Sequence, residues 1–221
     1  MHYSPFEENR KMKKLISLFV MLLLPLMASA TNYQEGKHYT VVSEQATNSP
    51  EVREFFSFYC PHCFKFEPFM SSVKKKLPEG VKFEFNHVDF LRGASPVMQG
   101  MLSKAVVVAE QMGMESKLMR ALFNYIHVQR AILTSEKDIR NIFVLNGADG
   151  DKFDKLMKSF GVNSKVKQMK KKQDYYSKSG GLTGVPAVIV NGRYKIENKA
   201  LNKENFDEDY NNLVKYLLAL K

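Results

Sequence analysis

The chain of 221 residues contains two cysteines, Cys60 and Cys63, in the segment Cys-Pro-His-Cys. In the first turn of a helix, this spacing places both sulfurs on one side, within reach of a disulfide bond. The segment directly follows the apolar run Val52–Tyr59, so we expect Cys60 where a strand ends and a helix begins. The unpaired N–H groups and the positive dipole end at that position favour thiolate, the attacking and leaving species in disulfide exchange. The spacing therefore predicts an exchangeable disulfide.

The two residues between the cysteines fit this chemistry. Pro61 lacks an N–H group, and the loss costs little in the first helical turn. We expect His62 to be exposed. A hydrogen bond from its ring to the Cys60 thiolate would stabilise the reduced form and make the disulfide a stronger oxidant.

Other uses of the two sulfurs fit less well. A structural disulfide that closes only four residues gains little chain entropy. A zinc site would need two further ligands, and although His62 and His87 are available, the paired-knuckle pattern is absent. Inert buried thiols would be unusual in an exported protein. We therefore predict neither a metal nor a separate cofactor, and take the Cys60–Cys63 disulfide as the redox group.

The elements that position the cysteines follow from hydrophobic patterning. Val52–Tyr59 predicts a buried central strand, followed by a helix that Pro68 should kink and by a second buried strand over Val81–Phe90. From Pro96 to about Tyr176 the pattern is helical, with Ser135 and Asp138 resembling a capping box. Strand pattern returns at Ala187–Val190, followed by the hairpin signal Asn191-Gly192, a return strand over Arg193–Ile196 and an amphipathic terminal helix.

The first 30 residues have the order of a secretory signal peptide. Lysines precede the apolar run Leu15–Met27, and Ala28-Ser29-Ala30 gives a small-residue cleavage pattern. The run has 13 residues, fewer than the roughly 20 that span a bilayer, which disfavours a permanent anchor. Met12 just precedes a lysine pair, which leaves open that residues 1–11 lie upstream of the true start. We expect a soluble exported protein in an oxidising compartment, the periplasm of a Gram-negative cell.

The formal charge of +10 would fall to +8 without residues 1–30, which hold four Lys/Arg and two Asp/Glu. Much of the excess lies in one run that we expect on the exposed face of a helix. A nucleic-acid role is disfavoured for an exported protein with no stacking aromatics beside these lysines. The lysines of this run are Lys165, Lys167, Lys170, Lys171 and Lys172.

A second segment, Gly184-Val185-Pro186-Ala187, precedes the late strand. Taken alone it would be a simple loop before a strand, because proline is tolerated at the first residue of a strand. Residues 32–221 resemble the DsbA family of thioredoxin-fold thiol:disulfide oxidoreductases. The features that carry the resemblance are this segment, Cys-Pro-His-Cys, the helical insertion, the run Glu54–Phe58 and the segment Lys74–Val81.

The resemblance implies an α/β thioredoxin fold with a helical domain inserted between its βαβ and ββα halves. We assign residues 31–91 and 172–221 to the thioredoxin-like domain and residues 92–171 to the insertion. The resemblance also implies a monomer that oxidises unfolded exported polypeptides bearing cysteines and that a DsbB-like membrane protein with its quinone reoxidises. We expect a substrate groove beside the cysteines, partly lined by the inserted helices.

Residue roles also follow from the resemblance. Cys60 would form the mixed disulfide and the more buried Cys63 would resolve it, while His62 would tune the couple. Pro186 would be cis and face the disulfide, with Val185 offering backbone hydrogen bonds to an extended substrate.

Glu54 would be a buried acid beneath the site and a proton relay. The family places a lysine beside that acid on the neighbouring strand, but here Phe85 takes the position, which leaves the charge pairing of Glu54 open. The alternatives for Glu54 are a carboxylate paired elsewhere or one facing water at a strand edge.

Two other functions stay open. An isomerase or reductase of the same fold is disfavoured because isomerases usually carry an added dimerisation domain and because the Pro61-His62 dipeptide favours oxidation. A thioredoxin-fold chaperone or binding module with an incidental disulfide is the alternative from another class.

Overall fold

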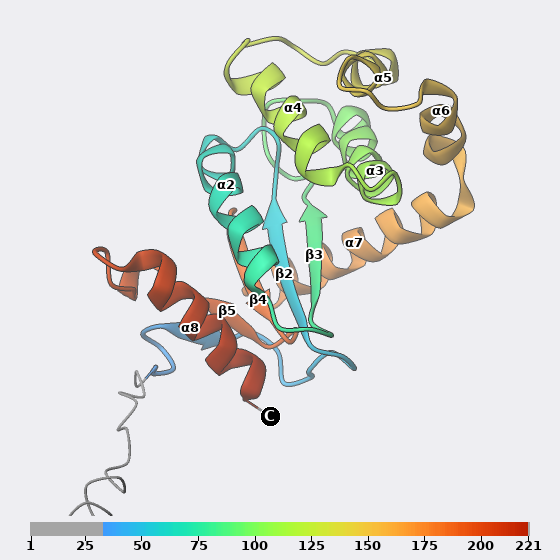
Figure 1. Ribbon diagram of the computed structural model, residues 1–221. Coiled ribbons are helices and arrows are strands. Elements are labelled where there is room, and N and C mark those ends of the chain that lie inside the picture. The colour runs from blue at the N-terminus through green and yellow to red at the C-terminus, as the bar shows by residue number, and fades with distance from the viewer. Residues whose placement is uncertain (1–32, 221) are drawn as a thin grey trace, which may run out of the picture. The chain divides into compact units, whose positions relative to one another are not determined.

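Strand β2 (Glu51–Phe56) lies in the middle of a mixed sheet in the computed structural model, which describes residues 33–220. The strand order is β1-β5-β4-β2-β3, in which β2 and β3 are parallel and the other pairs are antiparallel (Figure 1). Val52 and Phe55 are fully buried, so the predicted buried central strand is confirmed. The other strands are β1 (Tyr39–Val41), β3 (Lys82–His87), β4 (Ala187–Val190) and β5 (Tyr194–Ile196).

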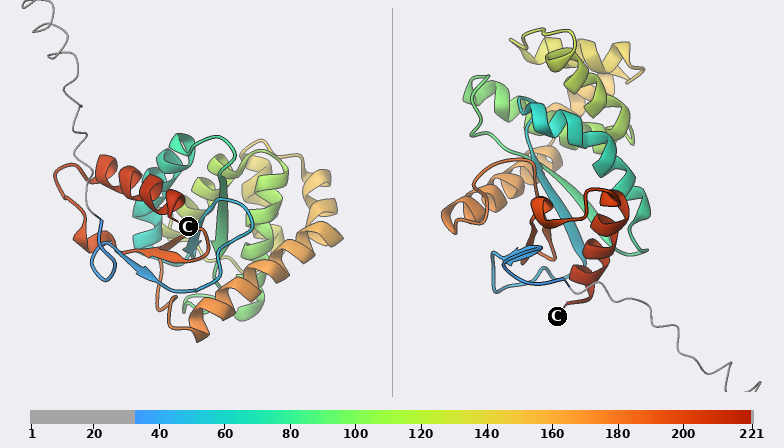
Figure 2. Two further views of the ribbon diagram at one scale, coloured as in Figure 1. Left: turned by 90° about the horizontal axis from the view of Figure 1, so that it is seen from below. Right: turned by 90° about the vertical axis from the view of Figure 1, so that its left-hand side faces the viewer.

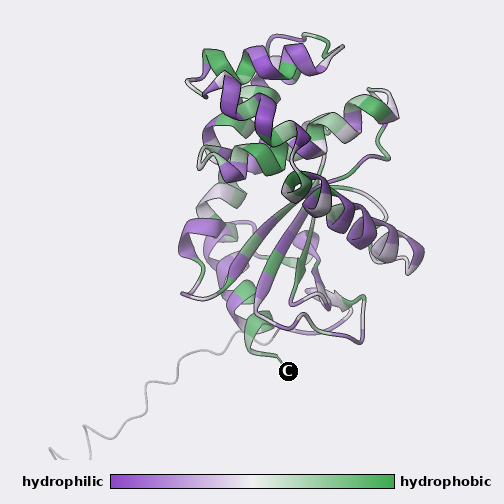
Figure 3. Cartoon of the chain, turned by 90° about the vertical axis from the view of Figure 1, so that its right-hand side faces the viewer, coloured by the Kyte–Doolittle hydropathy of each residue, from purple (hydrophilic) through white to green (hydrophobic). Residues whose placement is uncertain are grey.

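Helices cover both faces of this sheet, and the alternation of side chains along β2 explains how. Val52 packs in the cluster shared with α2 (Pro61–Lys76) and α8 (Phe206–Ala219), whereas Phe55 packs with Tyr176 of α7 (Phe160–Lys178) on the opposite face (Figures 1 and 2). Hydrophilic residues predominate along α7, in the hydropathy colouring of the chain (Figure 3). Glu54 lies between Val52 and Phe56 on the α2 side, since alternate residues of a strand share a face.

The chain between β3 and β4 is helical, as predicted. It forms α3 (Pro96–Gln111), α4 (Glu115–His127), α5 (Glu136–Leu145), α6 (Gly150–Lys158) and α7. The hydrophobic core that these helices share reaches the segment around the two cysteines, because Phe58, Cys60 and Cys63 belong to this core. The domain boundary predicted between residues 171 and 172 falls inside α7, which runs unbroken across it, so the domain limits remain a prediction.

Several local signals have the predicted outcome. Ser135 and Asp138 form a capping box at the start of α5. Asn191 and Gly192 adopt positive φ values of 51° and 69° in the turn between β4 and β5. Helix α2 contains Pro68 without ending there, and the kink predicted at this proline stays a prediction. The strands are shorter than the patterns indicated: β3 ends at His87, and β5 begins at Tyr194 because Arg193 still belongs to the turn.

The lysine run on α7 is only partly a solvated face. Lys167 and Lys171 are exposed, as expected. Lys165 instead pairs with Glu84 of β3, and Lys170 with Asp89. Part of this charge therefore ties α7 to the sheet edge.

The predicted signal peptide lies outside the described residues. Within residues 33–220, no helix combines the length and apolar character needed to cross a membrane.

Candidate active site

Cys60 is the residue at which β2 has ended and α2 begins, as the sequence predicted. Its backbone is extended, and its Sγ accepts a hydrogen bond from the Cys63 N–H at 3.1 Å, which makes it the N-cap of α2. Pro61 occupies the first helical turn, where its missing N–H would have been unpaired in any case. The helix start therefore directs one of its free N–H groups at a sulfur.

The two sulfurs have opposite protonation chemistry. Both are free thiols, with Cys60 3% and Cys63 1% exposed, so Cys63 is the more buried. The pKa of Cys60 is lowered to about 6, first by a hydrogen bond from the Cys63 side chain and then by the backbone N–H groups of Cys63 and His62 and the charge of His62, against an opposing effect of burial. Burial raises the pKa of Cys63, and the hydrogen bond to Cys60 adds to the rise. The pair therefore consists of one ionised and one protonated sulfur.

His62 is exposed, as expected, and its tuning of the couple stays a prediction. The hydrogen bonds of the described residues include none from the His62 ring to Cys60, but the His62 backbone N–H and the charge of His62 both lower the pKa of Cys60. The reason is geometric: in the first turn of a helix the N–H groups point back toward the N-cap, while this side chain extends into solvent.

The Val185–Pro186 peptide bond is cis, as the resemblance implied. The Val185 carbonyl oxygen lies 3.5 Å from Cys60 Sγ and accepts a hydrogen bond from this sulfur when it is protonated, so the loop before β4 contacts Cys60. A hollow of about 490 Å³ extends from Val185 and Pro186 toward the end of β5. Its lining comes from residues between 181 and 199 and includes neither cysteine, so the groove expected beside the cysteines, partly lined by the inserted helices, stays a prediction.

Glu54 is 3% exposed and lies beneath the site, between two neighbouring strands. Phe85 is its direct partner on β3, in the position where the family pattern has lysine. Both alternatives for Glu54 are wrong: it does not face water, and no ion pair involves it among residues 33–220. Burial raises its pKa to about 8, and the nearby charges of Glu67 and Cys60 add to the rise. Glu54 is thus mostly protonated at neutral pH.

Two further residues of the site were missed by the sequence analysis. Glu67, one helical turn after Cys63, is buried near Glu54, accepts a hydrogen bond from Ser71 at 2.9 Å and pairs with Arg120 of α4 at 3.5 Å. Its four-residue spacing from Cys63 was a usable signal.

His127, at the end of α4, is the second missed residue. Its Nε2 lies 2.8 Å from the carbonyl oxygen of Phe58, and its ring stacks on Phe64. A carbonyl can only accept, so the histidine is the donor. Nothing in the sequence spacing connects position 127 with the cysteines.

The geometry agrees with the comparison to known families. The family described as "DSBA-like thioredoxin domain" matches residues 51–211, a span that contains both cysteines, the cis proline and all the inserted helices.

The chain belongs to the DsbA family.

Curated DsbA relatives span nearly the whole chain. The thiol:disulfide interchange protein DsbA of Escherichia coli K12 is 38% identical over 216 residues, which cover 95% of this chain and 100% of the relative. DsbA of Yersinia pestis is 35% identical over the same coverage. Among solved structures, DsbA from Proteus mirabilis has a TM-score of 0.75 and 35% identity, covering 87% of this chain and 100% of the other. The chain is therefore a thiol:disulfide oxidoreductase with the thioredoxin-like DsbA fold.

Residues 33–220 contain no group of three or more His, Cys, Asp or Glu side chains that could hold a metal ion. DsbA-family chemistry acts through the protein's own cysteine pair, and Cys60 and Cys63 are the two cysteines of this chain.

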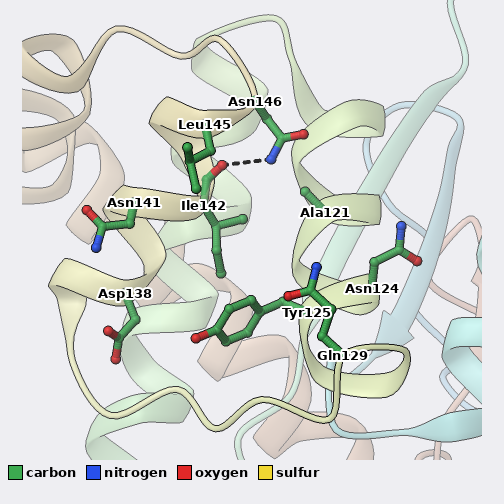
Figure 4. Close-up of a pocket in the computed structure, with 9 residues that line it drawn as sticks. All are labelled: Ala121, Asn124, Tyr125, Gln129, Asp138, Asn141, Ile142, Leu145 and Asn146. Carbon is green, nitrogen blue, oxygen red and sulfur yellow. Dashed lines mark hydrogen bonds between the residues drawn. The ribbon is translucent and has the colours of Figure 1, made fainter.

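A second hollow of about 410 Å³ lies between α4 and α5 of this DsbA chain, away from the sulfurs (Figure 4). Carboxamide side chains dominate it, including Asn124, Gln129 and Asn141. Its carboxylate, Asp138, caps α5 by accepting the N–H groups of Thr134 and Ser135. The residues that line it include no nucleophile or general base free for catalysis.

Proposed function

We propose that this chain is a periplasmic dithiol oxidase, which donates a Cys60–Cys63 disulfide to exported polypeptides. The observation that supports this direction is the asymmetry of the sulfurs: Cys60 is held as a thiolate and Cys63 as a thiol. A stabilised thiolate is a good leaving group and stabilises the reduced enzyme, so the disulfide form is a strong oxidant.

The first step is the attack of a substrate thiolate on Cys60 Sγ of the disulfide. A substrate–Cys60 bond forms, the Cys60–Cys63 bond breaks, and Cys63 leaves with the electron pair. Because its pKa is raised, Cys63 takes up a proton, and the protonated Glu54 beneath the site is its source. The resulting carboxylate regains a proton from water.

The second step releases the product. A second substrate thiolate attacks the substrate sulfur of the mixed disulfide, and Cys60 leaves as the thiolate that its N-cap position stabilises. The substrate has lost two electrons and two thiol protons, and the enzyme holds a dithiol. A DsbB-like membrane protein with a quinone would take up these electrons.

The cis loop is the proposed binding edge for an extended substrate. Val185 lies beside the reactive sulfur and would offer its backbone groups to the substrate, while Pro186 leaves no N–H to compete for them. A Cys-to-Ser variant of Proteus mirabilis DsbA was solved with the non-covalently bound peptide PWATCDS; that structure has a TM-score of 0.76 and 34% identity to this chain. This likeness supports a peptide-binding role for the same face here.

Trapping of intermediates tests the proposal. A Cys63→Ala variant, first converted with oxidised glutathione to its Cys60–glutathione mixed disulfide, should accumulate mixed disulfides with reduced unfolded proteins. The substrate thiolate displaces glutathione from Cys60, and no Cys63 is present to displace the substrate in turn. A Cys60→Ala variant is the matched control and should accumulate none. Equal trapping by both variants, or by neither, would contradict the assigned roles and favour a binding module with an incidental disulfide.

A further inference from the structure

The hollow beside the cis proline is lined by charged side chains as well as by the loop that contacts Cys60. Val185, Pro186 and Ala187 form the end next to Cys60, because Val185 accepts the hydrogen bond from the Cys60 thiol. Another part of the wall comes from the end of β5 and from the following 3-10 helix, Asn198–Ala200. A polypeptide whose cysteine reaches Cys60 along this loop passes that wall with its neighbouring side chains.

The charges of this wall do not cancel. Lys195 pairs with Glu197 at 3.1 Å, and the same Glu197 oxygen accepts a hydrogen bond from Thr40 at 3.2 Å. Lys199 is exposed, and no carboxylate of residues 33–220 pairs with it. The hollow therefore presents one unneutralised cation to whatever occupies it.

We infer that Lys199 makes this DsbA chain favour polypeptides with an acidic side chain beside the reacting cysteine. The inference rests on the oxidase function proposed above and names the substrate class of the same site. Lys199 is a specificity residue here, since it contacts the substrate flank and not the reacting sulfurs.

An exposed ion pair of this kind is weak and sensitive to salt. A typical exposed pair corresponds to an equilibrium factor of about 1.4 to 5. The attraction falls further when the ionic strength shortens the screening length to about 3 Å at 1 M salt. We therefore expect a moderate preference that is lost at high salt.

The test uses dithiol peptides that differ only at the residue next to the reacting cysteine, which is Asp, Asn or Lys. The second-order rate constant for their oxidation is measured with the wild-type protein, Lys199→Glu and Lys171→Glu. Lys171 is exposed on α7 and does not line the hollow, so its variant changes the net charge equally. Any effect of a neighbouring charge on the peptide thiol's own acidity cancels when the ratio of rates is compared between proteins.

The wild type should oxidise the Asp peptide about two- to fivefold faster than the Asn peptide at low salt, and equally fast at 1 M salt. Lys199→Glu should reverse the order in favour of the Lys peptide, and Lys171→Glu should keep the wild-type order. An unchanged order in Lys199→Glu, or equal changes in both variants, would overturn the inference while leaving the oxidase function intact. Failure of the wild type to oxidise any peptide would instead overturn the oxidase function itself.

Discussion

The pKa of Cys60 predicts a pH-dependent difference in stability between the dithiol and disulfide forms. The lowering of the Cys60 pKa from 9.0 to about 6 corresponds to a free energy of at most about 4 kcal/mol, at 1.36 kcal/mol for each tenfold change in the acid constant. A thiol with a depressed pKa stabilises the folded state when it is ionised. The contribution is thus fully present above pH 9 and is lost as the pH falls through 6.

At pH 7 the expected contribution is about 1.4 kcal/mol, because pH 7 lies one unit above the folded pKa. This free energy of about 1.4 kcal/mol shifts the equilibrium with glutathione about tenfold toward the dithiol form, which corresponds to about 30 mV in the reduction potential of this two-electron couple. The disulfide form has no Cys60 thiolate, so its stability should lack this contribution. The difference between the two forms should therefore grow from pH 5.5 to pH 8.

Two measurements check this reasoning. The absorbance of the thiolate near 240 nm, titrated against pH, should show a midpoint near 6 in the wild type and no such step in Cys60→Ala. Denaturant unfolding of both redox forms at several pH values should give the growing difference. A thiolate midpoint above pH 8, or a difference that stays constant between pH 5.5 and pH 8, would refute the account of the N-cap sulfur.

Two further predictions concern residues around the sulfurs. Glu54→Gln should stabilise the disulfide form more at pH 8 than at pH 5, because the raised pKa of Glu54 makes the wild type lose stability as the pH rises from 4.5 through about 8. Chemical unfolding at both pH values measures this difference. Equal effects of the substitution at pH 5 and pH 8 would contradict a buried protonated acid. His127→Leu should lower the unfolding free energy by about 1–2 kcal/mol and slow peptide oxidation, since the Phe58 carbonyl loses its hydrogen-bond donor. His127→Gln keeps a donor and should restore part of both the stability and the rate. A His127→Leu variant as stable and as fast as the wild type would show that the His127–Phe58 hydrogen bond does not hold the active-site loop.

The catalytic segment could be predicted from the sequence because local rules determine it. The β-prone run before Cys60 and the helical periodicity after Cys63 fix where the strand ends and the helix begins, and hence which sulfur becomes the N-cap. The turn at Asn191 and Gly192 was likewise predictable, since few residue pairs adopt two positive φ values in succession.

The surroundings of the sulfurs could not be predicted in the same way, because they depend on long-range packing. The His127–Phe58 contact joins residues 69 positions apart, and the Glu67–Arg120 pair joins two helices whose packing no local pattern specifies. The groove expected beside the cysteines, partly lined by the inserted helices, stays a prediction, because neither cysteine lines the hollow next to the cis proline. The inserted helices contact the other side of the active-site loop, through His127, while residues 181–199 form the hollow.

The contrast between the two cysteines shows which physical effect governs the chemistry. Both are almost fully buried, and burial alone would raise both pKa values. Only Cys60 accepts hydrogen bonds from the helix start and from the other thiol, and for this sulfur those bonds outweigh burial. Hydrogen bonding, first from the Cys63 thiol and then from the backbone of the helix start, therefore decides which sulfur leaves as a thiolate. It follows that the exposed ring of His62 only adjusts an asymmetry that the position of the helix start has already created.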